Sequence, residues 1–236
     1  MEIIIYFFII LIAVVIGSFI GAVTYRIPRG LGIVYGRSFC DHCHEPLGWI
    51  QNVPLFSYLV LNGKSFCCHK KISPRYFLIE FVTIIAAVYL YSVVSVYLFL
   101  IYFVLFLLCL SVLVIDLEHQ FIPDELIWLI LFLSIFVMGN SPFQNLLAGF
   151  LAALFLLIIY LLTKGQGMGL GDVKLAVVLG PWIGLYSSLI WILGAFLTGG
   201  LVASILLILG LAKWKQKIAF GPFLIISFLY VFFTKI

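Results

Sequence analysis

Two aspartates in this sequence stand at the edges of long apolar runs. Asp116 follows the apolar run at residues 96–115, and Asp172 begins another run at residues 172–186. A carboxylate within or beside a membrane span is costly and is therefore a candidate functional group. Two carboxylates that share a proton can activate water for attack on a peptide carbonyl, one as base and the other as acid. We interpret Asp116 and Asp172 as such a pair, with a helix-capping or headgroup-facing role for each as the alternative.

Four glycines alternate with other residues just before Asp172: Gly165, Gly167, Gly169 and Gly171. Glycine permits backbone angles that other residues avoid and lets a second chain approach the backbone closely. An extended peptide could therefore bind here, and a flexible turn between two spans is the alternative. We predict that Gly169, Gly171, Lys174 and Asp124 contact a substrate. Asp124 follows a proline at a helix start and is also suited to a capping role.

The composition indicates which elements must position these side chains. Of the 236 residues, 65% are hydrophobic and 9% are charged, whereas soluble domains carry about a quarter charged residues. A soluble fold of this length could not bury so much apolar surface, so the sequence predicts an all-α polytopic membrane protein. A span needs about 20 helical residues. This length predicts eight spans, the first of them retained: residues 3–25, 76–94, 96–115, 125–139, 143–163, 172–186, 188–210 and 219–234.

Basic residues are distributed unequally between the predicted loops. Of the 13 Lys and Arg residues, seven lie in the loop at residues 26–75. With eight spans and the N-terminus outside, all basic residues except Lys235 fall on one side of the membrane. The positive-inside rule makes that side cytoplasmic. The net charge of +4 therefore needs no nucleic-acid partner.

The same topology divides the chain into three parts. Residues 1–25 are the first transmembrane helix, residues 26–75 a cytoplasmic Cys-containing loop, and residues 76–236 a transmembrane domain with both aspartates. One helix runs inward to Asp116 and another runs outward from Asp172, so both carboxylates are expected near the cytoplasmic boundary. A proton-coupled transporter, an alternative class, would place its acids near mid-membrane.

The cytoplasmic loop contains a candidate metal site made of Cys40, Cys43, Cys67 and Cys68. Its first two cysteines form a CxxC knuckle that suits structural zinc, but the other two are adjacent and form no second knuckle. Three interpretations stay open: zinc bound by all four thiolates, zinc bound with a histidine in place of one thiolate, and no metal. The histidines concerned are His42, His44 and His69. A reducing cytoplasm argues against disulfides.

Two further features concern the first two spans. Gly17 and Gly21 are four residues apart and suit close helix packing. Glu80 is an isolated acid in an apolar run. Substrate binding, a transferase site and a structural contact, for example with Arg75 or Lys71, are open interpretations of Glu80.

Motifs spread over nearly the whole chain carry a family resemblance. Residues 169–172 read GLGD, and residues 116–124 read DLEHQFIPD. These match the GxGD motif and the other aspartate motif of type IV prepilin peptidases, which the segments at 17–30 and 51–59 also resemble. In that family the first Asp of the longer motif and the Asp of GxGD are catalytic. The resemblance therefore implies that role for Asp116 and Asp172.

The resemblance implies an aspartic endopeptidase of the bacterial cytoplasmic membrane that acts without a catalytic metal. Its substrates would be type IV prepilins or pseudopilins, cut after a glycine that ends a basic leader peptide. Members with the long loop also methylate the new N-terminus with S-adenosylmethionine, so the resemblance implies this activity too, although no glycine-rich nucleotide motif marks a cofactor site. A preflagellin-type GxGD protease is the nearest alternative, and the cysteine loop argues against it.

The cysteine loop departs from the family pattern, in which many members carry two CxxC pairs. When residues 71–75 are aligned with the family, Cys68 matches the second cysteine of the second pair. Ser65 stands where the first would be, and Cys67 is out of register.

Overall fold

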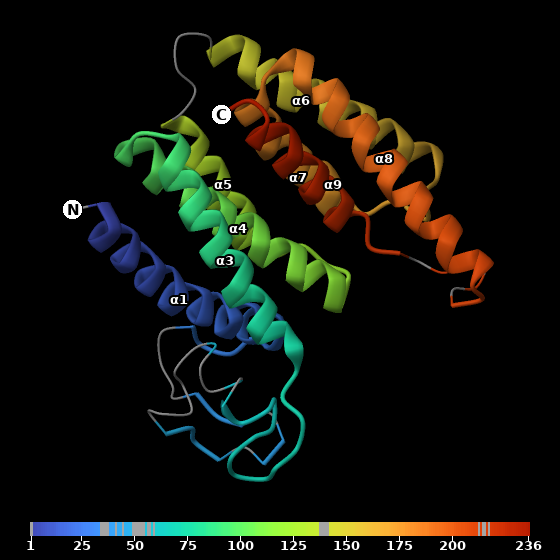
Figure 1. The fold of residues 1–236 in the computed structure, drawn as a ribbon. Coiled ribbons are helices and arrows are strands. Elements are labelled where there is room, and N and C mark those ends of the chain that lie inside the picture. Colours follow the sequence, from blue (N-terminus) through green and yellow to red (C-terminus); the bar gives the residue numbers. More distant parts are fainter. Residues whose placement is uncertain are drawn as a thin grey trace. The chain divides into compact units, whose positions relative to one another are not determined.

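The structure is a computed structural model of the chain. It describes residues 2–33, 38–40, 42–43, 45–48, 55, 58, 60–136, 142–211, 213, 216 and 218–236. In these ranges the regular elements are helices, accompanied by two isolated β-bridges, which confirms the all-α prediction. The chain forms two compact units, Met1–Leu107 and Leu108–Ile236, called here the N-terminal and C-terminal units. Figure 1 shows their helices, and each unit is described by itself.

The N-terminal unit is built on two packed helices. Its elements are α1 (Glu2–Arg26), the short 3-10 helix η1 (Ile27–Arg29), α3 (Pro74–Val93) and the first half of α4 (Val96–His119). The helices α1 and α3 lie side by side (Figure 1). A Cβ added to Gly17 would lie 2.9 Å from the backbone Cα of Glu80, and one added to Gly21 would meet the ring of Tyr76 at 3.1 Å. The predicted close packing through these two glycines is confirmed.

The C-terminal unit is arranged around one short helix, α7. Its elements are the rest of α4, α5 (Asp124–Ile135), α6 (Pro142–Leu162), α7 (Leu170–Ile183), α8 (Leu185–Ile208) and α9 (Gly221–Phe233). Helix α7 contacts α5, α6, α8 and α9. Gly149 of α6 and Gly180 of α7 bring their backbones into direct contact, because a Cβ on either would overlap the other helix. The helix that begins beside Asp172 is therefore held rigidly on several sides.

A buried tryptophan joins the last two helices. Trp191 of α8 is fully buried, and its Nε1 donates a hydrogen bond of 2.7 Å to the carbonyl oxygen of Leu224 in α9. Ser227 of α9 donates its hydroxyl to the carbonyl oxygen of Trp191, also at 2.7 Å. These two bonds satisfy polar groups that lipid or apolar core could not satisfy.

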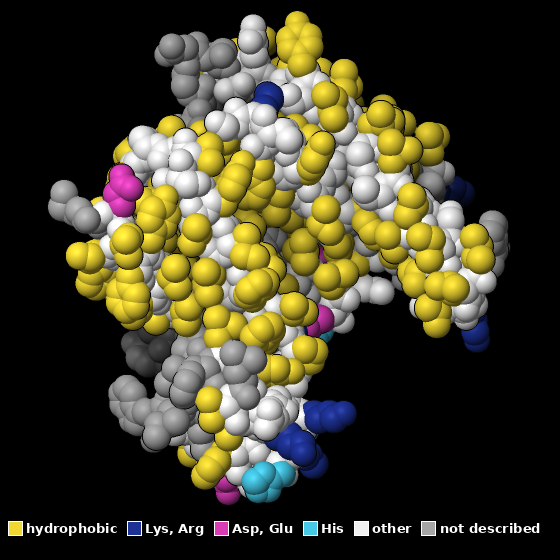
Figure 2. Space-filling model, in the orientation of Figure 1, with side chains coloured by type: hydrophobic (Ala, Val, Ile, Leu, Met, Phe, Trp, Pro, Cys, Tyr) yellow, Lys and Arg dark blue, Asp and Glu magenta, His cyan; other side chains and the backbone are white. Residues whose placement is uncertain are grey.

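The surface of the helices is apolar, as a membrane protein requires. Figure 2 shows hydrophobic side chains spread over the visible helical surfaces. Among the described residues, five helices are long and apolar enough to cross a membrane: α1 with η1, α3, α4, α6 and α8. Helix α7 has 14 residues, which extend only about 21 Å at 1.5 Å per residue. Helices α5 and α9 are of similar length, so the count of eight spans stays a prediction.

Candidate active site

Asp116 lies one turn before the end of α4. The helix ends because Gln120 adopts a left-handed backbone with φ of 56°, while its N–H still bonds to the carbonyl oxygen of Asp116 at 2.9 Å. The Asp116 side chain is only 4% exposed. Its Oδ2 is buried, accepts no side-chain hydrogen bond from the described residues and lies against the backbone of Gly221.

Asp172 lies in the first turn of α7. Gly169 is the N-cap of this helix and has an extended backbone, with φ −84° and ψ 150°. Oδ2 of Asp172 accepts a hydrogen bond of 3.2 Å from the backbone N–H of Gly169. Asp172 is therefore not the N-cap residue, but its carboxylate accepts a hydrogen bond from the backbone of the N-cap residue, Gly169. Its side chain is 6% exposed.

The C-terminal unit brings the two aspartates together. They come from the end of α4 and the start of α7, and their carboxyl groups are close enough to interact electrostatically. Two like charges that interact in a poorly solvated site disfavour double ionisation, so the pair favours the state in which one carboxyl group is protonated. The two residues singled out by the sequence thus form one buried acidic site.

Gly221 is a further residue of this site, which the sequence analysis missed. It is the first residue of α9, and a Cβ added to it would lie 2.5 Å from Oδ2 of Asp116. The start of α9 therefore contacts the carboxyl group through backbone alone. The Gly221-Pro222 pair at the start of the last apolar run is the available sequence signal, because proline favours the first turn of a helix.

Ile122 lies two residues before α5 and packs beside the acidic site. Its side-chain atoms would lie 3.2 Å from a Cβ on Gly171 and 3.3 Å from a Cβ on Gly221. This isoleucine therefore packs between the first turns of α7 and α9. An apolar wall here limits the water around the carboxylates, and low local dielectric strengthens their interaction. Gly171 is needed for this packing because a side chain at that position would press on Ile122. Of the four glycines before Asp172, only Gly165 has a left-handed backbone, with φ of 72°.

Lys174 and Asp124, both predicted to contact a substrate, contact each other. Nζ of Lys174 and Oδ1 of Asp124 are 2.7 Å apart, and both side chains are more than half exposed. Asp124 is the first residue of α5 and lies after the N-cap residue Pro123, so the capping interpretation of Asp124 is wrong. Exposed ion pairs contribute about 0–1 kcal/mol. The pair links α5 to α7 at the edge of the acidic site.

The N-terminal unit assembles the four predicted cysteines into one cluster. Their sulfur atoms all lie within 4.8 Å of one another. The Sγ atoms of Cys40 and Cys68 are 3.8 Å apart, and those of Cys43 and Cys67 are 3.0 Å apart. Tetrahedral zinc with Zn–S bonds of about 2.3 Å separates its sulfurs by about 3.8 Å. The four sulfur atoms therefore fit a zinc ion once the distance between the Sγ atoms of Cys43 and Cys67 increases from 3.0 Å to about 3.8 Å.

Two similar turns hold these cysteines. In the first, Phe39 and Pro46 form a β-bridge and the N–H of Cys40 bonds to the carbonyl oxygen of Glu45 at 2.9 Å. In the second, Lys64 and Lys71 form the bridge and Ser65 N–H bonds to Lys70 at 2.8 Å. Each residue of the second turn lies 25 positions after its counterpart in the first, so Ser65 corresponds to Cys40 and Cys68 corresponds to Cys43. Ser65 therefore lies where the family pattern has the first cysteine of its second pair. Cys67, next to Cys68 in the sequence, supplies the fourth sulfur.

The remaining candidates for this metal site lie elsewhere. His42 directs Nε2 to the carbonyl oxygen of Lys71 at 3.2 Å, and His69 is not part of the cluster. His44 and all but Leu55 and Tyr58 of the resembling segment at 51–59 lie outside the described residues. Among the open interpretations, the geometry favours four sulfur ligands over a substituted histidine.

The thiols of the cluster differ in acidity. Burial opposes ionisation of Cys40, but hydrogen bonds, first among them that with Ser65, outweigh it and lower the Cys40 pKa to about 6. The hydrogen bond with Cys67 raises the pKa of Cys43 to about 12. One thiolate is therefore preformed at neutral pH, which favours capture of a cation.

An all-helical membrane protein that buries two neighbouring aspartates has the arrangement expected of a membrane aspartic protease. Comparison with known families agrees with this class. Residues 11–94 match the Bacterial Peptidase A24 N-terminal domain, and residues 101–204 match the Type IV leader peptidase family. Both aspartates lie in the second segment, and all four clustered cysteines lie in the first.

Similar proteins cover almost the whole chain. A protein named prepilin leader peptidase/N-methyltransferase from Vibrio cholerae is 31% identical over 247 residues, which cover 95% of this chain and 94% of the relative. A protein of the same name from Neisseria gonorrhoeae is 33% identical, with 92% and 86% covered. The one from Pseudomonas aeruginosa is 30% identical, with the same coverage of 92% and 86%. No solved structure matches significantly. The chain belongs to the type IV leader peptidase family.

Proposed function

We propose that this chain is a membrane-bound prepilin leader peptidase whose catalytic pair is Asp116 and Asp172. The observation that carries the proposal is the meeting of these two buried carboxyl groups at the ends of α4 and α7. The coverage of relatives named prepilin leader peptidase/N-methyltransferase supports the substrate class. The match of residues 11–94 to the bacterial N-terminal domain supports this assignment over a preflagellin-type protease.

The pair performs general acid–base catalysis with one shared proton. The ionised carboxyl group takes a proton from water while the water oxygen bonds to the scissile carbonyl carbon, and the protonated group gives its proton to the carbonyl oxygen. The tetrahedral adduct then collapses, and the C–N bond breaks with its electron pair on nitrogen. A proton from the pair passes to that nitrogen, which becomes the new N-terminal amine. No metal takes part in these steps.

The glycine segment before α7 binds the leader junction in extended form. Gly169, the N-cap residue of α7, leaves room for an approaching backbone, because a Cβ there would meet only the Asp172 carboxyl group at 3.5 Å and the Gly171 backbone at 3.9 Å. Gly171 lets the first turn of α7 pack closely on Ile122 beside it. Lys174 and Asp124 contact the flanking residues of the substrate from the edge of the site. The substrate's apolar helix lies in the bilayer, so its junction meets the carboxyl groups at the membrane boundary.

The orientation in the membrane follows the charge distribution. The N-terminus is outside, residues 26–75 face the cytoplasm, and residues 1–25 and 76–236 lie in the membrane, with cleavage at the cytoplasmic face. The loop with seven basic residues supports this orientation. A reporter fused after Ile236 tests it, since eight spans with the N-terminus outside place the C-terminus outside as well.

The cysteine cluster holds a structural zinc ion through Cys40, Cys43, Cys67 and Cys68. The sulfur distances and the preformed thiolate of Cys40 support this assignment. Zinc would fix the two turns relative to each other, and methylation of the new N-terminus is assigned to the same unit. Elemental analysis should find one zinc per chain in wild type and less after Cys40→Ala.

Co-expression with a prepilin tests the peptidase assignment. Asp116→Asn and Asp172→Asn should each reduce cleavage by about 1,000-fold or more, because the amide cannot exchange the shared proton. Glu125→Gln, an exposed acid in the first turn of α5, is the matched control and should cleave normally. Gel mobility of the prepilin reports cleavage. Processing that survives both aspartate substitutions would exclude the proposal.

A further inference from the structure

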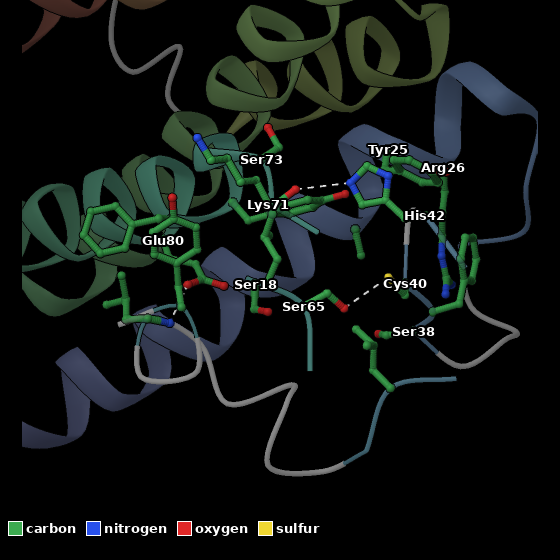
Figure 3. A pocket seen from close by; sticks show the side chains of 18 residues that line it. Ser18, Tyr25, Arg26, Ser38, Cys40, His42, Ser65, Lys71, Ser73 and Glu80 are labelled. Atoms are coloured by element: carbon green, nitrogen blue, oxygen red, sulfur yellow. Dashed lines mark hydrogen bonds between the residues drawn. The ribbon is translucent and has the colours of Figure 1, made fainter. Parts of the chain in front are cut away.

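The N-terminal unit contains a cavity that the peptidase reaction does not use. It measures about 390 Å³ and lies between α1, the start of α3 and the cysteine loop (Figure 3). This volume is within the range of about 300–1,000 Å³ that small-molecule sites occupy. Much of its wall is aromatic: Tyr25, Phe39, Tyr58, Tyr76 and Phe77. Cys40 and Ser65 also line it, so the cysteine cluster forms part of the wall.

Glu80 provides a buried acid at one end of this cavity. The side chain is 6% exposed, and its Oε2 accepts a hydrogen bond of 2.7 Å from the backbone N–H of Leu55. No cation in the described part of the chain forms an ion pair with it. Arg75, a partner considered from the sequence, instead donates to the hydroxyl of Thr24 at 2.8 Å. A buried carboxylate without a cationic partner is costly and is suited to receive a cationic ligand.

Arg26 lines the opposite end of the cavity. Figure 3 shows Glu80 and Ser18 on one side of the cavity and Arg26 with Tyr25 on the other. Nη1 of Arg26 donates to the carbonyl oxygens of Gly32 and Ile33, both at 3.2 Å, so the guanidinium is fixed beside the cavity. The cavity therefore has Glu80 at one end, Arg26 at the other and aromatic rings in its wall, which Lys71 also lines.

We propose that this cavity binds a sulfonium methyl donor of the S-adenosylmethionine class and that Glu80 binds the amine to be methylated. The donor's carboxylate lies toward Arg26, and its cationic sulfur lies among the aromatic rings. The amine is the N-terminus released by cleavage, so the assignment rests on the proposed function. The relatives' shared name includes an N-methyltransferase, and the aspartate pair accounts only for the peptidase.

Methyl transfer needs no reactant beyond the sulfonium donor, the N-terminal amine and Glu80. An N-terminal amine has an ordinary pKa of about 8, so it arrives largely as an ammonium ion. Glu80 accepts its proton and frees the lone pair. The nitrogen attacks the methyl carbon, the N–C bond forms, and the S–C bond breaks with its electron pair on sulfur. The sulfonium becomes a neutral thioether, and the positive charge passes to the methylated nitrogen.

Two substitutions separate donor binding from transfer. Ala22→Phe places a ring in the cavity and should weaken binding of radiolabelled S-adenosylmethionine to the purified protein by about tenfold or more. Val15→Phe, on an exposed position of the same helix, is the control and should bind normally. Glu80→Gln keeps an oxygen that can accept from Leu55, so it should bind the donor normally but transfer methyl groups about 100-fold more slowly. Mass spectrometry of the cleaved pilin reports transfer, and gel mobility reports cleavage, which all three variants should retain.

The outcomes distinguish this assignment from the peptidase assignment. Wild-type protein that cleaves but binds no donor overturns the cavity assignment and leaves the peptidase standing. Normal donor binding by Ala22→Phe, or normal methylation by Glu80→Gln, also overturns it. Wild-type protein that binds the donor but never cleaves would instead reject the proposed peptidase.

Discussion

The aspartate site and the cysteine cluster are built in opposite ways. Asp116 and Asp172 sit at helix ends that are held by backbone contacts, such as that of Gly221 with the Asp116 carboxyl group. The four cysteines sit in two short turns, each held by one bridge and a few backbone hydrogen bonds. A site held by packed helices is rigid without a ligand, because packed cores resist small displacements. A site held by short turns needs a bound ion to fix its geometry.

Among the tests of this difference between the two sites, the largest effect is expected from a substitution at Gly221. Gly221→Ala places a methyl group 2.5 Å from the present position of Asp116 Oδ2, so the carboxyl group or α9 must move. A displacement near 1 Å at reacting groups costs about 100-fold in rate. Prepilin cleavage should fall by about that factor, measured by gel mobility over time.

Zinc content should stay unchanged in the same variant, because the cysteines belong to the other unit. Gly200→Ala is the control, since a Cβ there meets nothing within 4 Å. Normal cleavage by Gly221→Ala would show that the acidic site is not held as rigidly as its packing indicates.

The next effect concerns the cysteine turns. Cys67→Ser removes one of four sulfur ligands, and zinc affinity should fall by at least about tenfold. Ser65→Cys in the same protein should restore it, because Ser65 holds the position in the second turn that Cys40 holds in the first. Competition with a chelating dye measures both affinities.

Cleavage by Cys67→Ser should change much less than its zinc affinity, in contrast to Gly221→Ala. Cys109→Ala, a buried cysteine of α4, is the control for the loss of any thiol. If the double variant with Cys67→Ser and Ser65→Cys binds zinc as poorly as Cys67→Ser alone, the equivalence of the two turns is contradicted.

A third prediction concerns pH in the zinc-free protein. The Cys40 pKa is lowered to about 6, whereas a thiol in an unfolded chain has a pKa of about 8.5. The folded state therefore favours the thiolate, and this contribution to stability is complete above about pH 8.5 and is lost as the pH falls toward 6. Ultraviolet thiolate absorbance should show an ionisation step near pH 6.

This step should be missing in Cys40→Ser and present in Cys43→Ser, since the pKa of Cys43 is raised to about 12. A step that stays near pH 6 after Cys40 is replaced would assign the thiolate to another residue. Either way, thiolate titration should leave the aspartate site unaffected if the two sites are independent.

The smallest effect is expected at the ion pair of Lys174 and Asp124. Both side chains are more than half exposed, so a double-mutant cycle on unfolding should give a coupling free energy of about 0–1 kcal/mol. Lys174→Ala leaves the Asp124 charge unopposed and should lower the KM for a basic leader about two- to threefold at low salt. Asp124→Asn should raise it. Equal KM values in all variants would remove this pair from the substrate contacts.

The sequence by itself determined the class of the molecule and indicated candidate residues for its chemistry. Composition established an all-helical membrane protein, and isolated acids in apolar surroundings indicated Asp116 and Asp172. The spacing of residues 40–43 indicated a metal site, and alignment indicated Ser65 as its irregular position. Such inferences are available because charge and sulfur are rare in such a chain, so each occurrence is informative.

Only the tertiary structure decided which surfaces meet. Gly221 at the Asp116 carboxyl group, Ile122 between two helix starts and the cavity that ends at Glu80 join segments distant in sequence. The apolar runs give no helical periodicity, because both the buried and the lipid-facing sides of these helices are hydrophobic. Without that periodicity a sequence does not reveal which face of a helix contacts another. The physical reason is that lipid replaces water as the surrounding solvent and removes the polar face that marks the outside of a soluble helix.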